Sequence, residues 1–193
     1  MRETLSVTSG ILFIAAFVPY IYAVLYKNAK PSKTSWLIWW GSDFLAFAGM
    51  LAKHSLNGQI IAAVLGGVTV VVLSLKKGVP GWTLLDKFCL AGATAGALIW
   101  WMTDNANAAI IASQAVVFIG SIPTAVSVWQ DPTRENPIAW IFYSLSCIAA
   151  VLAIPAWDIA HALQPVNFLV VDCGIALILL GGRGYGWLTE KGG

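Results

Sequence analysis

The most regular feature of the chain is the alternation of long apolar runs with short polar breaks. A helix needs about 20 apolar residues to cross a bilayer, and seven runs approach or reach this length. None alternates apolar and polar residues as a barrel strand does, so helices are predicted. The short breaks predict antiparallel neighbours. The seven predicted spans cover about 5–26, 35–52, 59–75, 84–102, 106–129, 136–154 and 164–182.

Composition supports an all-α integral membrane protein. The 193 residues are 59% hydrophobic and only 10% charged, whereas about a quarter of a soluble domain is charged. The mean hydropathy is +0.78. The three cysteines lie in apolar runs without a zinc-like Cys/His spacing, so we expect no metal and no cofactor. The net charge of +2 reflects loop lysines and does not indicate a nucleic-acid partner.

The distribution of basic residues predicts an orientation. With seven spans, Arg2 and Lys53 fall on the face of the N-terminus and nine basic residues on the other. Basic residues stay on the cytoplasmic side. We therefore predict a multi-pass protein of the cell membrane, with the N-terminus outside and the C-terminus cytoplasmic. The nine residues are Lys27, Lys30, Lys33, Lys76, Lys77, Lys87, Arg134, Arg183 and Lys191.

An offset of 104 residues aligns the two halves of the chain. It pairs Pro19 with Pro123 and Trp36 with Trp140 without a gap. In each half a proline inside a span precedes a basic break and a tryptophan that opens the next span. One linker span between the halves gives both the same orientation, a parallel repeat. The predicted units are a three-helix repeat over 1–80, a linker helix over 81–104, and a second three-helix repeat with a short cytoplasmic tail over 105–193.

Individual helices carry two further signals. Pro19 and Pro123 lie deep in their spans, where a proline frees backbone carbonyls, so they are either hinges or static kinks. In the linker span, Gly92 and Gly96 are four residues apart and form a small-residue face that lets another helix come close.

Two acids near the membrane centre are the leading candidates for chemistry. Asp43 lies about 12 Å into its span at 1.5 Å per residue, and Asp172 reaches a similar depth. A carboxylate at this depth costs at least about 2.5–3.5 kcal/mol and usually has a function. The alternative is an acid that fixes helix packing. Either acid could exchange a proton.

Aromatic and polar residues surround the first acid in the sequence. Trp36 and Trp40 share a helix face with Asp43, and Trp140 and Ser144 hold the equivalent positions in the second half. Such rings can stack on a sugar or enclose a cation, or they can form the aromatic belt of the membrane interface. Further candidate substrate donors are Gln114 and Asn167.

The layout also resembles the SWEET sugar transporters and their PQ-loop relatives. The matching stretches are "FVPYIYAVLYKNAKPSKTSW" and "SIPTAVSVWQDPTRENPIAW". Pro19–Tyr20 and Pro123–Thr124 stand where that superfamily often has Pro-Gln. The resemblance implies two three-helix repeats, a sugar or amino-acid substrate, and a sugar-binding role for Asn167. The third span offers only Thr69 in place of a second asparagine.

These features predict a transporter of a small polar solute, either a sugar or an amino acid or amine. The substrate would bind at the membrane midplane between the repeats. Transport would proceed by alternating access and could be linked to protons through Asp43 or Asp172. The alternative is a receptor or sensor that binds without transport. We expect no enzyme activity, because the acids lack a protease context. The expected partners are the substrate and the bilayer; the sequence leaves a homo-oligomer open.

Overall fold

The computed structural model describes residues 1–27, 29, 31, 33–78 and 83–190. The side chains of Leu85, Pro123, Arg134 and residues 182–190 lie outside this description. Lys30 and Lys191, two of the nine basic residues used to predict the orientation, also lie outside the described residues. The same is true of the predicted boundary between the first repeat and the linker helix, at residues 80–81.

The described residues form seven α-helices and one short 3-10 helix. Each predicted span overlaps one helix, and the predicted all-α class is confirmed at this level. The helices are α1 (Arg2–Tyr26), α2 (Lys33–Ala52), α3 (Gly58–Lys77), α4 (Leu84–Thr103), α5 (Ala106–Gln130), α6 (Pro137–Leu152) and α7 (Ile159–Glu190), with η1 (Pro132–Arg134) before α6.

The largest difference from the predicted boundaries is at α7. This helix begins at Ile159, five residues before the predicted start at 164, and continues to Glu190, eight residues beyond the predicted end at 182. Asp158 accepts a hydrogen bond on Oδ1 from the backbone N of His161 at 2.9 Å, as an N-cap residue does. Pro165 therefore lies inside α7, in addition to Pro19 inside α1.

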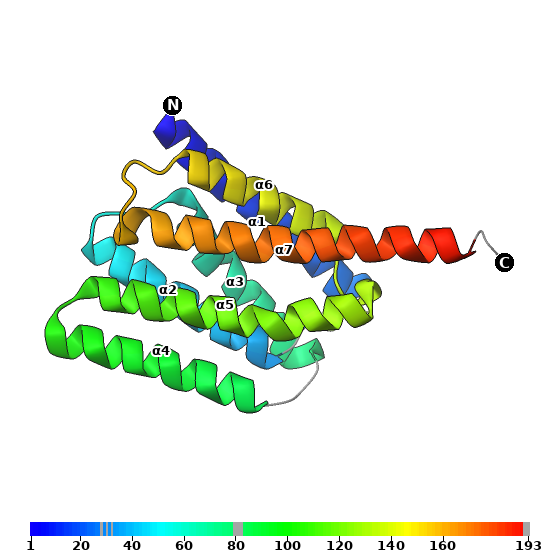
Figure 1. Ribbon diagram of the computed structural model, residues 1–193, viewed down its shortest axis with the longest axis horizontal. Helices are drawn as coiled ribbons and strands as arrows, with labels where there is room; N and C mark the ends of the chain where they lie inside the picture. Colours follow the sequence, from blue (N-terminus) through cyan, green and yellow to red (C-terminus); the bar gives the residue numbers. More distant parts are fainter. Residues whose placement is uncertain (28, 30, 32, 79–82, 191–193) are drawn as a thin grey trace.

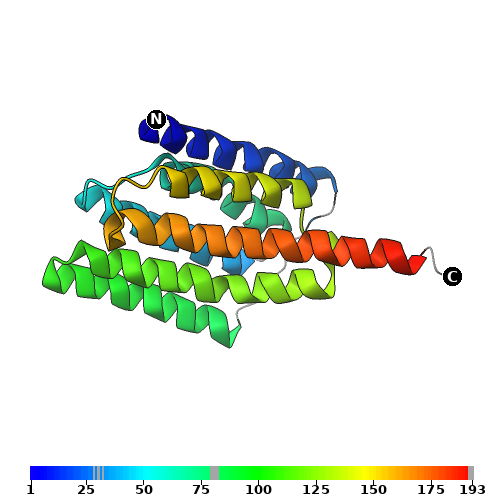
Figure 2. The ribbon, with the colours of Figure 1, turned by 45° about the horizontal axis from the view of Figure 1, so that its top comes forward.

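The helices pack as a bundle whose contacts follow a simple order. α3 packs against both α1 and α2, and α7 packs against both α5 and α6. The two sets meet where α1 contacts α6 and where α2 contacts α5. α4 lies at one edge, against α5 and with a smaller contact to α2 (Figures 1 and 2).

The outer surface of the bundle is apolar. α1, α3, α5 and the Ile159–Gly181 part of α7 are long and apolar enough to cross a membrane, judged by length and composition. α6 is apolar but shorter, and α2 and α4 do not meet that measure. Leu65 and Leu177 are 65% and 70% exposed, which suits lipid contact. These features indicate a membrane-embedded protein.

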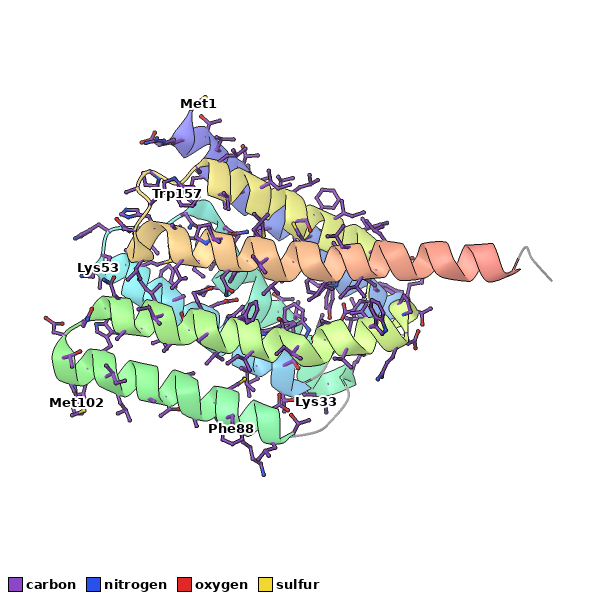
Figure 3. All side chains as sticks on the ribbon, viewed as in Figure 1. Met1, Lys33, Lys53, Phe88, Met102 and Trp157 are labelled. Atoms are coloured by element: carbon purple, nitrogen blue, oxygen red, sulfur yellow. The ribbon has the colours of Figure 1, made fainter. Side chains whose placement is uncertain are left out.

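The two ends of the bundle carry different loops. Met1, Lys53, Met102 and Trp157 lie at one end, and Lys33 lies at the other (Figure 3). We call the end with Met1 the N-terminal end and the end with Lys33 the C-terminal end. α7 projects beyond the other helices at the C-terminal end (Figure 1).

Candidate functional site: a cavity with two carboxylates

A small cavity lies inside the bundle, where side chains from α1, α2, α3, α5, α6 and α7 converge. Its volume is about 60 Å³. This is more space than a single water molecule requires. It is lined by Phe13, Phe17, Trp36, Trp39, Trp40, Asp43, Ala63, Val117, Trp140, Tyr143, Phe168, Val171 and Asp172.

Two acids from different helices face this cavity. Asp43 comes from the middle of α2 and Asp172 from the middle of α7. Asp172 is 9% exposed, and its Oδ2 accepts a hydrogen bond from Cys147 Sγ at 3.2 Å. Asp43 Oδ1 is buried and has no hydrogen-bond partner among the described residues. The described lining residues include no Lys, Arg or His, so the site is acidic without compensation.

Aromatic rings form most of the remaining wall. The rings of Trp36 and Trp39 meet edge to face, with centroids 5.6 Å apart and planes at 76°. Trp40 donates from Nε1 to the carbonyl of Val64 at 3.0 Å, which fixes its ring against α3. Gly67 permits this contact, because a Cβ there would lie 3.0 Å from Trp40 Cδ1.

Two further polar atoms at the cavity lack a partner. The Tyr143 hydroxyl and Trp39 Nε1 are buried, and neither has a hydrogen-bond partner among the described residues. Tyr143 is 4% exposed. Buried polar groups are hydrogen-bonded in most structures. A group of unsatisfied atoms at one cavity therefore indicates a place that a ligand can occupy.

Toward the N-terminal end, three amide side chains from α7 and from the start of α3 form a hydrogen-bonded chain. Asn57 Nδ2 donates to Gln164 Oε1 at 2.9 Å, and Gln164 Nε2 donates to Gln59 Oε1 at 3.0 Å. Gln59 Nε2 in turn donates to Cys147 Sγ at 3.1 Å. Gln59 and Gln164 are fully buried. We call Asn57, Gln59 and Gln164 the amide layer.

The amide layer lies between two cavities. Asn57 also lines a second cavity of about 200 Å³ at the N-terminal end, together with Arg2, Glu3 and His54. The hydrogen bonds continue from Gln59 through Cys147 to Asp172. The layer thus lies between the N-terminal surface and the acids.

Toward the C-terminal end, an acid and three aromatic side chains close the cavity. Trp36 Nε1 donates to the Tyr20 hydroxyl at 3.0 Å, and that hydroxyl contacts Glu135 Oε1 at 3.5 Å. Trp140 Nε1 donates to Glu135 Oε2 at 3.2 Å. We call Tyr20, Trp36, Glu135 and Trp140 the indole–acid layer; it joins α1 and α2 to α6 and the segment before α6.

Glu135 precedes α6 and lies outside the helices. Burial raises the pKa of its carboxyl to about 7, while the hydrogen bonds from Trp140 and Tyr20 act in the opposite direction. Asn136 ties the same segment to α1, because its Nδ2 donates to the carbonyl of Pro19 at 3.1 Å. The indole–acid layer therefore contains a group that can change charge near neutral pH.

The structure brings together five of the eight predicted binding residues. Trp36, Trp40, Asp43, Trp140 and Asp172 all line the cavity.

The other three lie outside the lining and have other partners. Ser144 Oγ donates to the carbonyl of Trp140 at 2.8 Å. Asn167 Nδ2 donates to Gln114 Oε1 at 2.9 Å and to the Gln114 carbonyl at 3.0 Å, which joins α5 to α7. Of the predicted hinges, Pro19 lies in α1, and the side chain of Pro123 lies outside the described ones.

Several residues of the site were not predicted from the sequence. Gln59 and Gln164 are 105 residues apart, whereas the ungapped offset of 104 pairs Gln59 with Leu163, so that comparison of the two halves does not reveal them. Glu135 was assigned to a polar break. Tyr143 lies inside the predicted span 136–154.

Comparisons with known proteins identify no similar protein. A scan against protein-family models, a search of curated proteins and a search of solved structures found no match to this chain. The functional argument therefore depends on the site.

Proposed function

We propose that this protein is a membrane carrier for a small polar solute that works by alternating access. The observation that carries the proposal is an acidic cavity inside the bundle with a polar layer on each side. A carrier needs a central site and two gates that open in turn. The amide layer and the indole–acid layer both consist of side chains from facing helices, held together by hydrogen bonds that helix movement can break.

We further propose that the bundle is two parallel three-helix repeats joined by α4 as a linker, as in the SWEET and PQ-loop carriers. The helix contacts support this arrangement. Exchanging α1, α2 and α3 for α5, α6 and α7 leaves the pattern unchanged: the third helix of each set packs between the other two. The same exchange converts the α1–α6 contact into the α5–α2 contact. The cavity then lies between the repeats.

We also propose that the N-terminal end faces outward, because most basic residues lie toward the other end and basic residues stay on the cytoplasmic side. Transport would be linked to protons through Asp43 or Asp172, since two like charges at one small cavity repel each other. Uptake that does not vary with pH would contradict this linkage.

Alternating access can be tested without knowing the substrate. Val117 lines the cavity, so Val117→Cys places a thiol there in a background with Cys89→Ala, Cys147→Ser and Cys173→Ala. A membrane-impermeant thiol reagent should label this cysteine from either side of sealed vesicles. Leu65→Cys, which is exposed on the apolar surface, is the matched control and should stay unlabelled.

The labelling pattern separates carrier from receptor. Labelling of the cavity cysteine from one side only would favour the alternative, a receptor or sensor that binds without transport. Labelling from neither side would show that the cavity does not open.

A further inference from the structure

We infer that the central cavity binds a small monovalent organic cation of guanidinium or alkylammonium type. The inference rests on the proposed carrier function and names its substrate class.

Charge provides the first argument. Asp43 and Asp172 face the same cavity, and none of its described lining residues is basic. A carboxylate kept from water is strongly unfavourable unless an opposite charge or hydrogen bonds compensate it. A neutral sugar brings no positive charge, and an anion adds repulsion. A cation compensates the acids directly.

Partner geometry provides the second argument. Asp172 already accepts a hydrogen bond from Cys147, whereas Asp43 Oδ1 has no partner among the described residues. The Tyr143 hydroxyl is equally free and can accept a hydrogen bond. Asp43 is thus the ion-pairing group, and Tyr143 is a second acceptor for an N–H of the ligand.

The walls provide the third argument. Trp36, Trp40 and Trp140 line the cavity, and an indole face attracts a desolvated cation. The cavity is small, at about 60 Å³, so a compact cation such as guanidinium or tetramethylammonium is the expected ligand.

The test uses a charged and a neutral ligand of one shape. Guanidinium at millimolar concentration should raise the melting temperature of the protein in nanodiscs and change its tryptophan fluorescence. Urea, its neutral counterpart, should do neither at the same concentration. Tetramethylammonium and tert-butyl alcohol repeat the comparison without N–H donors, and glucose tests the sugar alternative.

Three variants locate the site. Asp43→Asn should weaken guanidinium binding at least tenfold. Asp104→Asn changes an exposed acid of the loop between α4 and α5 and should leave binding unchanged. Tyr143→Phe removes a hydroxyl that makes no hydrogen bond in the described structure; it should fold normally and weaken guanidinium more than tetramethylammonium.

The outcomes distinguish this inference from the carrier proposal. Stronger binding of urea than of guanidinium would overturn the cation inference, as would binding of glucose alone. Unchanged affinity in Asp43→Asn would overturn it too. Two-sided labelling of Val117→Cys would still support the carrier. Guanidinium binding combined with one-sided labelling would support the cation site and reject transport.

Discussion

At the residue scale, Glu135 should make stability depend on pH. Its carboxyl has a pKa of about 7 in the folded protein against 4.5 ordinarily. The folded state therefore binds the proton more tightly, so this group's contribution to stability is present below about pH 4.5 and is lost as the pH rises through about 7. Glu135→Gln should remove this slope. The measurement is the melting temperature of wild type and variant between pH 4.5 and 8.

The difference between the two proteins isolates Glu135 from other titrating groups. Glu3→Gln changes an exposed acid at the opposite end of the bundle, and its profile should follow the wild type. Parallel profiles for wild type and Glu135→Gln would show that this carboxyl does not titrate as proposed.

A second residue, Cys147, should matter as a hydrogen-bonding group. Its thiol accepts from Gln59 and donates to Asp172, and it is fully buried. Cys147→Ala leaves both partners without it and should lower the free energy of unfolding by about 1–3 kcal/mol. Cys147→Ser keeps a donor and an acceptor and should recover most of the loss. Equal melting temperatures for the two variants would show that packing, not hydrogen bonding, defines this position.

The sequence could predict only part of this site, for a physical reason. An acid deep in an apolar run can be recognised from the sequence alone, because a carboxylate inside the membrane is energetically unfavourable. Both such acids, Asp43 and Asp172, line the cavity. Whether a polar side chain faces a ligand depends on its partners in space. Gln114 and Asn167 are predicted substrate donors, but Asn167 donates a hydrogen bond to Gln114 instead. The amide layer joins residues more than 100 positions apart.

At the element scale, the position of α4 depends on how closely it approaches α5. A Cβ added to Gly96 would overlap the Cβ of Ala112 on α5, whereas one added to Gly92 would lie 3.5 Å from Val116 Cγ2, an ordinary contact. Gly96→Ala should therefore destabilise the protein by about 1–3 kcal/mol. Gly92→Ala should be neutral or stabilising by up to about 1 kcal/mol, because alanine favours a helix over glycine.

Thermal melting of both variants in one detergent is the measurement. The two sites lie in one helix, four residues apart, so equal effects would show that helix propensity and not close approach decides. The glycine pair was visible in the sequence, since small residues at this spacing typically mark a helix contact. The sequence did not show that only one of them has no space for a methyl group.

Helix boundaries show a similar limit. Apolar runs predicted the seven helices because burial and lipid exposure both require apolar residues. Helix ends depend on caps instead: Asp158 extends α7 to Ile159, and Asn136 precedes α6 with its side chain accepting from two backbone N–H groups. Such caps consist of single polar residues in breaks that otherwise look like loops.

At the scale of the whole molecule, the two layers should act as opposite gates. Gln164 holds the amide layer through hydrogen bonds to Gln59 and Asn57. Removing it with Gln164→Ala should speed labelling of the Val117→Cys thiol from the N-terminal side and slow it from the other. Glu135→Ala removes the acceptor that joins Tyr20 to Trp140 and should have the reverse effect.

The opposite signs are what a two-state carrier requires, because a substitution that weakens one gate shifts the population toward the state open on that side. A bundle that is merely loosened would be labelled faster from both sides in both variants. Ser144→Ala provides the matched control: this hydroxyl bonds only within its own helix to the Trp140 carbonyl among the described interactions. It should leave both rates unchanged. Opposite shifts in the two gate variants, absent in the control, would tie the two ends of the molecule to one equilibrium.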